Sequence, residues 1–263
     1  MKYQVTPEQI EQYQRDGFLL VEDFLDAQEL EHWRNVTDEA VAQRLESSPK
    51  GTGGDYYSQV FTQCIRLADS HEGMRDIMLD PRLGELAGTL AQVDGIRIWH
   101  DQALIKPPYG NPTSWHLDNP YWSFDSQSSI SIWVALDDAT LHNGCMWYIP
   151  GSHLEATYEN AGIGANMRDL FKIYPQWLER EAVAAPAKAG SAVLHNGLVA
   201  HGAGTNMTPR PRRAMTCGFM PDGSTFNGKQ NILPQELFES YQIGDTINSD
   251  FNPLIWSRSS GQG

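Results

Sequence analysis

The chain has 263 residues, of which 40% are hydrophobic and 20% charged, a profile typical of one globular domain with a well-buried core. Its formal net charge of −14 argues against binding to nucleic acid or to an anionic membrane, because phosphate contacts require surfaces rich in Lys and Arg. The N-terminal residues lack the apolar segment of a secretory signal, and no apolar run approaches the length of a membrane span. The three widely spaced cysteines form neither a disulfide framework nor a zinc motif, so we expect a protein of the reducing cytoplasm.

The N-terminal region predicts mainly helices. Thr6–Gln9 has the pattern of a capping box, with Pro7 at the first helical position, and Gly17 ends this short helix. The apolar run 18–21 then predicts a buried strand. Asp26 is expected to cap a longer helix, the Ser/Pro/Gly-rich stretch 47–54 to form a loop, and Asp80 with Pro81 to open a helix that ends near Ala91.

From residue 96 the pattern changes to short β-type runs separated by turn residues, at 96–100, 103–105, 130–136, 145–149, 192–194 and 214–220. Strands that follow helices predict a mainly β fold, with a double-stranded β-helix (a cupin-like jelly roll) buttressed by the N-terminal helices. We expect one domain over 1–263, comprising a helical buttress (1–95), a jelly-roll core (96–222) and a C-terminal extension (223–263). A polar insertion at about 155–181 would interrupt the core as a helical segment or a lid.

One short motif points to metal chemistry. His116 and Asp118 stand two residues apart in an aromatic-rich stretch, and on an extended strand two such side chains share a face. One more histidine from a neighbouring strand would complete two imidazoles and one carboxylate, the facial triad typical of non-haem Fe(II) oxygenases. The alternative is a hydrogen-bonded surface pair, which is the commoner role of such a motif taken alone.

The spacing of the histidines along the chain does not by itself identify the third metal ligand. The histidines that compete for this place are His100, His142, His153, His195 and His201, and the last two are separated by only six residues.

Several ordered motifs together resemble the phytanoyl-CoA dioxygenase family of Fe(II)/2-oxoglutarate oxygenases. They are the stretch 115–118, the run 133–140, the segment 143–153, and the segment from His195 through His201 and Gly202 to Asn206, Thr208, Arg212 and Arg213. Residues 6–30 also resemble the opening of the family, whereas the polar middle and the tail after about Asp222 are unmatched.

The resemblance implies residue roles. It makes His116, Asp118 and His201 the metal ligands and His195 a position that is not a ligand. It assigns Arg212 to the far carboxylate of 2-oxoglutarate, which suits the bidentate bonds of a guanidinium. Gln102 and Trp133 match positions that touch the co-substrate, and Thr208 could add a hydroxyl bond. Trp133 and the arginines also have structural alternatives. Trp133 could be a core residue, and any one of Arg210, Arg212 or Arg213 could be a surface charge. If Arg212 faces inward on a strand, Arg213 faces outward.

The implied cofactor is Fe(II), with 2-oxoglutarate and O2 as co-substrates. The expected reaction hydroxylates an unactivated C–H bond of a small molecule while 2-oxoglutarate is converted to succinate and CO2. Related halogenases carry a small residue at the carboxylate position, so Asp118 disfavours halogenation. Desaturation, epoxidation and ring formation remain open, as do a non-catalytic jelly-roll module and a zinc hydrolase, although the chain has no His-Glu-x-x-His motif.

The substrate itself is not predicted by the sequence. Candidate pocket residues are Asn119, Tyr121, Trp122 and Phe124, and the insertion at 155–181 is either a lid or a surface segment. The acidic net charge favours a substrate other than a CoA thioester. We expect no nucleic-acid or membrane partner, and the sequence does not predict the oligomeric state.

Overall fold

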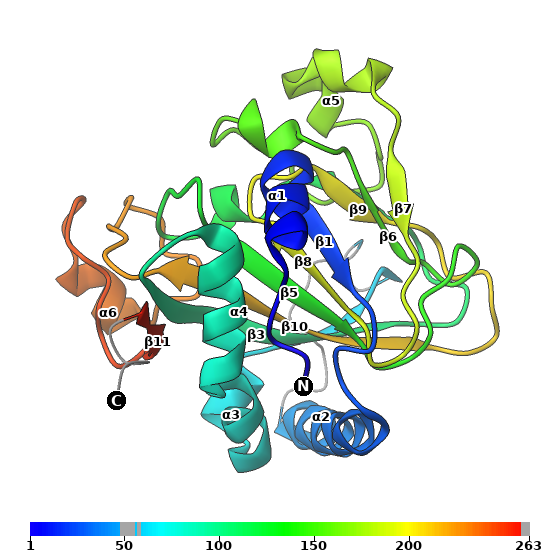
Figure 1. The fold of residues 1–263 in the computed structure, drawn as a ribbon, viewed down its shortest axis with the longest axis horizontal. Helices are drawn as coiled ribbons and strands as arrows, with labels where there is room; N and C mark the ends of the chain where they lie inside the picture. Colours follow the sequence, from blue (N-terminus) through cyan, green and yellow to red (C-terminus); the bar gives the residue numbers. More distant parts are fainter. Residues whose placement is uncertain (48–55, 57–58, 259–263) are drawn as a thin grey trace.

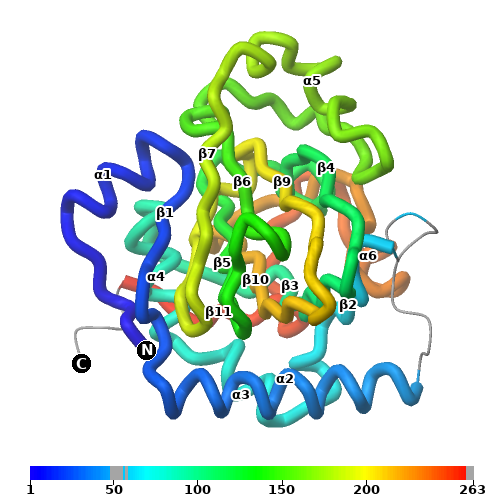
Figure 2. The backbone as a smooth tube through the Cα atoms, turned by 90° about the vertical axis from the view of Figure 1, so that its right-hand side faces the viewer, coloured from blue at the N-terminus to red at the C-terminus, as the bar shows by residue number. Residues whose placement is uncertain are grey.

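The computed structural model describes residues 1–47, 56 and 59–258. Two antiparallel sheets face each other, and in Figure 2 the smaller sheet lies in front of the larger. The larger sheet has the order β1 (Phe18–Val21), β8 (Ala192–Asn196), β5 (Ile130–Ala135), β10 (Arg212–Pro221), β3 (Gly95–Lys106) and β11 (Leu254–Ser257), and β2 (Thr62–Ile65) also pairs with β3. The smaller sheet has the order β4 (Thr113–His116), β9 (His201–Ala203), β6 (Met146–Tyr148) and β7 (Val183–Ala185). The predicted jelly roll is confirmed.

Helices from the N-terminal region cover the outer face of the larger sheet (Figure 1). They are α1 (Pro7–Asp16), α2 (Ala27–Ser47), α3 (Glu72–Met78) and α4 (Pro81–Ala91). Strand β5 is buried on both faces and its side chains alternate between two cores. Ile132 packs with the helices, whereas Trp133 packs toward the smaller sheet. The helices therefore hold the larger sheet from behind and leave its inner face for the site.

The predicted helix caps are confirmed. The Thr6 hydroxyl accepts a hydrogen bond from the Gln9 amide, and the Gln9 side chain accepts one from the Thr6 amide. Gly17 ends α1 with a φ of 82°, a left-handed conformation that favours glycine. The carboxylates of Asp26 and Asp80 accept bonds from the first amides of α2 and α4.

Some elements differ from the prediction. The runs 96–100 and 103–105 belong to one 12-residue strand, β3. Strands β1, β2 and β11 come from outside 96–222 yet pair within the larger sheet. Of the loop expected at 47–54, Ser47 ends α2 and the rest lies outside the described residues.

The insertion at 155–181 contains only short helical turns, α5 (Leu170–Ile173) and a 3₁₀ turn at Pro175–Glu179, and it projects beyond the open end of the smaller sheet (Figure 2). The C-terminal region adds α6 (Gln235–Ser240). Across the described part of the chain, no helix has the length and apolar character that crossing a membrane would require.

Candidate metal centre

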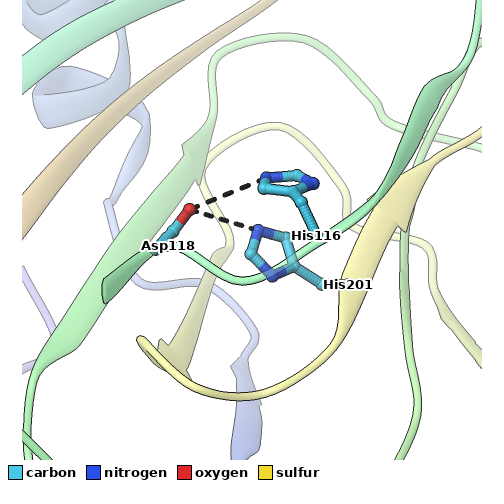
Figure 3. Close-up of side chains that lie close together, drawn as sticks. All are labelled: His116, Asp118 and His201. Carbon is cyan, nitrogen blue, oxygen red and sulfur yellow. Dashed lines mark ion pairs between the residues drawn. The ribbon is translucent and has the colours of Figure 1, made fainter. Parts of the chain in front are cut away.

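Three side chains, those of His116, Asp118 and His201, converge on one another (Figure 3). His116 ends β4 and His201 begins β9, and the two residues are paired directly across the smaller sheet. Asp118 Oδ1 lies 3.7 Å from His116 Nε2 and 3.6 Å from His201 Nε2. The three potential ligand atoms all lie within 4.8 Å of one another. Imidazole and carboxylate ligands bind first-row metals at about 2.0–2.2 Å, so one ion placed between the three atoms fits this set.

Asp118 reaches this position by a different route from the one predicted. It was expected to continue the strand of His116, but β4 ends at His116 and Asp118 has helical dihedrals, φ −80° and ψ −53°. A 3₁₀ turn with Pro120 inside it follows directly at Asn119–Tyr121. The amides of Asp118 and Asn119 both donate to the carbonyl of Gly197. The turn before β9, and not strand alternation, therefore aims the carboxylate at the imidazoles.

Both histidines are oriented by main-chain carbonyls. His116 Nδ1 lies 2.8 Å from the Ser114 carbonyl, and His201 Nδ1 lies 3.0 Å from the Val199 carbonyl. A protonated Nδ1 that donates to a carbonyl leaves the Nε2 lone pair for a metal. Burial lowers the pKa of His116, and lowers that of His201 well below its ordinary value. Both rings are therefore neutral near pH 7, the form that binds a metal.

The second carboxylate oxygen of Asp118 is also fixed. Its Oδ2 accepts a hydrogen bond from the Ser131 hydroxyl at 2.8 Å and lies 3.1 Å from His195 Nε2. His195 Nδ1 in turn lies 3.2 Å from the Tyr148 hydroxyl. Burial favours the neutral carboxyl, but His201, His195 and His116 together outweigh it and hold the pKa of Asp118 well below its usual range. His195 thus orients the Asp118 carboxylate, a role that sequence reasoning missed.

A cavity of about 430 Å³ opens beside these side chains. The aromatic residues that line it are Phe61, Tyr121, Trp122 and Trp133. Gln102, on β3, also lines it and accepts a hydrogen bond from Gln63 at 2.5 Å. Among the described lining residues there is no Lys, Arg or Glu.

A buried guanidinium lies behind the wall of this cavity. The Arg212 side chain is only 1% exposed, and none of its three nitrogens has a hydrogen-bond partner among the described residues. Its Cζ lies 5.0 Å from the Trp133 ring centre and 5.9 Å from that of Phe61. Burial lowers the pKa of Arg212 to about 10, so the group stays charged at neutral pH. A buried cation without a partner is costly unless an anion pairs with it, and a carboxylate matches its two-pronged geometry.

Lys106 is a second buried cation that sequence reasoning did not single out. It is directly opposite Arg212 in the β3–β10 register and is fully buried. Its Nζ donates to the carbonyl of Asn111 at 2.6 Å and lies 4.6 Å from the Phe61 ring centre. Burial, assisted by the charge of Arg212, lowers the pKa of Lys106 to about 7. Its position four residues after Gln102, on the same alternating face, was the available signal.

The two other arginines lie away from the cavity. Arg213 faces outward from Arg212, as alternation predicts, and pairs with Asp137 and Asp38. Arg210 is exposed. The Thr208 hydroxyl donates to Asn206 Oδ1 at 2.7 Å and does not line the cavity, so the structure does not place it on the co-substrate side.

The candidate substrate residues divide into two groups. Tyr121 and Trp122 line the cavity. Asn119 and Phe124 do not: Asn119 is fully buried and bonds the main chain at Phe124 and Ser126, and Phe124 packs in a core with Trp99. Asn119 and Phe124 thus shape the loop that carries the two lining residues.

The three other histidines that were candidates for the third ligand lie apart from the metal ligands. His100 lines the cavity, and burial lowers its pKa to about 4. His153 Nε2 bonds the Gln14 carbonyl in α1, and His142 is exposed in the turn before β6. None of these three joins the convergent set of His116, Asp118 and His201.

Comparisons with known proteins agree with this geometry. A sequence model described as phytanoyl-CoA dioxygenase (PhyH) matches residues 13–214. A phytanoyl-CoA dioxygenase of Arabidopsis thaliana is 24% identical over 245 residues, which cover 80% of this chain and 87% of that protein.

The crystal structure of the non-heme alpha-ketoglutarate-dependent carbocyclase SnoK from nogalamycin biosynthesis superposes with a TM-score of 0.80 at 25% identity, covering 95% of this chain and 96% of SnoK. The epimerase SnoN, solved in complex with Fe3+, alpha-ketoglutarate and nogalamycin RO, gives a TM-score of 0.78 at 25% identity, covering 95% and 98%. The chain belongs to the phytanoyl-CoA dioxygenase family.

Proposed function

We propose that this protein is an Fe(II)- and 2-oxoglutarate-dependent oxygenase that hydroxylates a small molecule at an unactivated C–H bond. The observation that carries the proposal is the pairing of two features, one lining the cavity and one buried behind its wall at Trp133 and Phe61. One is a His-Asp-His set with neutral imidazoles and an ionised carboxylate, and the other is the buried, unpaired guanidinium of Arg212. A zinc hydrolase or an inert jelly roll has no need for the second feature.

Each residue has a defined task in this proposal. His116, Asp118 and His201 hold the iron, which supplies the chemistry of O2 activation with 2-oxoglutarate. Arg212 binds the far carboxylate of 2-oxoglutarate, and Trp133 and Gln102 border the space between that carboxylate and the metal ligands. His195 and Ser131 keep the Asp118 carboxylate oriented.

Hydroxylation is favoured over halogenation because Asp118 occupies the place that a halide would need. Ring formation or epimerisation is a second candidate outcome, supported by the similarity to SnoK and SnoN over 95% of the chain. Hydroxylation, ring formation and epimerisation use the same three metal ligands, so the choice among them depends on how the substrate is held.

The cavity supports an uncharged and largely apolar substrate. Tyr121, Trp122 and Ile232 line it, as do Gly162 and Ile163 from the insertion. A CoA thioester would need cations, and the described lining offers none. We further propose that 1–263 forms one domain and that the enzyme acts in the cytoplasm, where its three free, buried cysteines would stay reduced.

The proposal is tested by turnover under air with Fe(II), 2-oxoglutarate and a library of uncharged aromatic small molecules. Succinate release that rises with one compound identifies a substrate, and mass spectrometry of the product identifies the reaction. A gain of one oxygen atom supports hydroxylation, a loss of two hydrogen atoms supports ring closure or desaturation, and an unchanged mass supports epimerisation. Asp118→Ala is the control, and succinate release from this variant at the wild-type rate would contradict the proposal.

A further inference from the structure

The main chain of Leu117, the residue between two metal ligands, lies outside the sheet. Strand β4 ends at His116, so no neighbouring strand bonds Leu117. The side-chain amide of Asn160 bonds it instead. Asn160 Oδ1 accepts from the Leu117 amide at 3.1 Å, and Asn160 Nδ2 donates to the Leu117 carbonyl at 2.7 Å. One side chain thus satisfies both main-chain groups of Leu117, as a strand partner would.

The Leu117 side chain is held by the same insertion. It is fully buried in a cluster that includes Leu170, Tyr174 and Trp177. The insertion therefore holds Leu117 by its main chain and by its side chain, while the next two amides are held from the opposite side by Gly197. The conformation of 116–118 is consequently set by contacts from two separate segments.

The segment that carries Asn160 also forms part of the cavity wall. Gly162 and Ile163 line the cavity beside the metal ligands. The Tyr121 hydroxyl donates to the Ala161 carbonyl at 2.9 Å, and the Gly164 amide donates to the Ser114 hydroxyl at 3.2 Å. Asn160 is half-buried at the point where this wall meets the ligand segment.

We propose that Asn160 is a positioning residue that ties the cavity wall at 160–164 to His116 and Asp118 through the main chain of Leu117. The inference rests on the proposed function only in taking His116 and Asp118 as metal ligands. A molecule that contacts Gly162 or Ile163 therefore also stabilises the conformation in which Asn160 bonds the main chain of Leu117. Iron that needs this conformation in turn stabilises the cavity wall at 160–164. This coupling is reciprocal, as linkage between two binding events requires.

Asn160→Ala removes both bonds to Leu117. Asn160→Asp keeps the size and the acceptor but removes the donor, and it places a carboxylate oxygen against the Leu117 carbonyl. Asn166→Ala is the matched control, because Asn166 lies in the same insertion and, among the described residues, its side chain bonds only the nearby Asp169 and Arg168. Thermal unfolding of each variant establishes that it is folded.

Two measurements on the full chain then test the coupling, both anaerobic and without turnover. The first is the Kd for Fe(II), which we expect to rise about tenfold in both Asn160 variants, in line with the effect of removing groups that orient metal ligands. The second is hydrogen exchange of residues 156–166, which Fe(II) should slow in the wild type and in Asn166→Ala but not in the Asn160 variants.

The outcomes separate this inference from the proposed function. If the folded wild type binds no Fe(II), the proposed metal site is wrong, and the coupling to it is wrong with it. If the wild type binds Fe(II) and either folded Asn160 variant keeps the wild-type Kd and the wild-type exchange response, the metal site stands and the role of Asn160 is overturned. Should Asn160→Ala not fold, Asn160→Asp alone decides between these results.

Discussion

His195 Nε2 lies 3.1 Å from Asp118 Oδ2, whereas His116 and His201 lie nearest the other carboxylate oxygen, Oδ1. His195 is therefore a partner of the Asp118 carboxylate, although it stands only six residues before His201 in the sequence. The contact fixes the rotation of the carboxylate, so that Oδ1 remains turned toward His116 and His201.

His195→Ala should weaken Fe(II) binding by about ten- to a hundredfold, because the carboxylate loses one of its two orienting partners. His201→Ala should abolish measurable binding, because a ligand is lost. Anaerobic Fe(II) titration of the two variants checks the distinction. Equal losses of Fe(II) affinity in the two variants would indicate that His195 is itself a metal ligand.

Arg212→Ala should raise the Kd for 2-oxoglutarate by about two orders of magnitude, since a hydrogen bond to a charged group contributes about 1.5–3 kcal/mol. Fe(II) binding should stay unchanged, because Arg212 is not among the converging ligands. Titration of the Fe(II)-loaded variant with 2-oxoglutarate measures the effect. Arg210→Ala is the matched control, as Arg210 is exposed. A larger effect from Arg210 than from Arg212 would reverse the assignment.

Lys106 should make the stability of the metal-free protein depend on pH. Burial lowers the pKa of Lys106 from 10.5 to about 7 in the folded state. Between these values the unfolded chain binds more protons, so stability rises with pH through this window. Lys106→Met should therefore raise the unfolding temperature most at pH 7 and below, and the gain should shrink toward pH 10. Thermal unfolding against pH measures it, with Lys188→Met, at an exposed position, as the control. A gain that is the same at every pH would contradict the assignment.

Gly202 lies on β9 against the main chain of β4. A Cβ at Gly202 would lie 2.8 Å from the Thr113 carbonyl oxygen, a main-chain atom that yields only if β4 and β9 move apart. Gly202→Ala should cost about 1–3 kcal/mol of stability, as overpacking does, and should weaken Fe(II) binding because His116 and His201 separate. Gly204→Ala is the control, since the nearest contact there is an ordinary 3.6 Å. Chemical unfolding and Fe(II) titration of both variants would show the difference, and equal behaviour would contradict it.

The sequence predicted the elements whose signals are local. The capping box at Thr6, the N-caps at Asp26 and Asp80, and most of the β-type runs are set by neighbours in the chain, and the structure confirms them. Strand β11 could not be predicted in this way, because its place depends on pairing with β3, more than 140 residues earlier.

The candidate site likewise combines residues that the sequence predicts with contacts that only the fold creates. The type and spacing of His116 and Asp118 were enough to nominate them, and the family resemblance was needed to choose His201, although the strand geometry assumed for Asp118 was wrong. The clamp by Asn160 and the burial of Lys106 beside Arg212 arise from tertiary contacts between distant segments. No local pattern encodes the contact of Asn160 with Leu117 or the role of His195, and only the alternation shared with Gln102 indicated that Lys106 faces inward.

The site that we propose holds iron on His116, Asp118 and His201 and the far carboxylate of 2-oxoglutarate on Arg212. The most direct test is an anaerobic titration of the metal-free protein, first with Fe(II) and then with 2-oxoglutarate, followed in the visible spectrum. The claim predicts the weak charge-transfer band of a 2-oxo acid chelated to iron in the wild type, no band in His201→Ala, and a band in Arg212→Ala only at much higher 2-oxoglutarate. A folded wild-type protein that binds Fe(II) but never develops the band would contradict it.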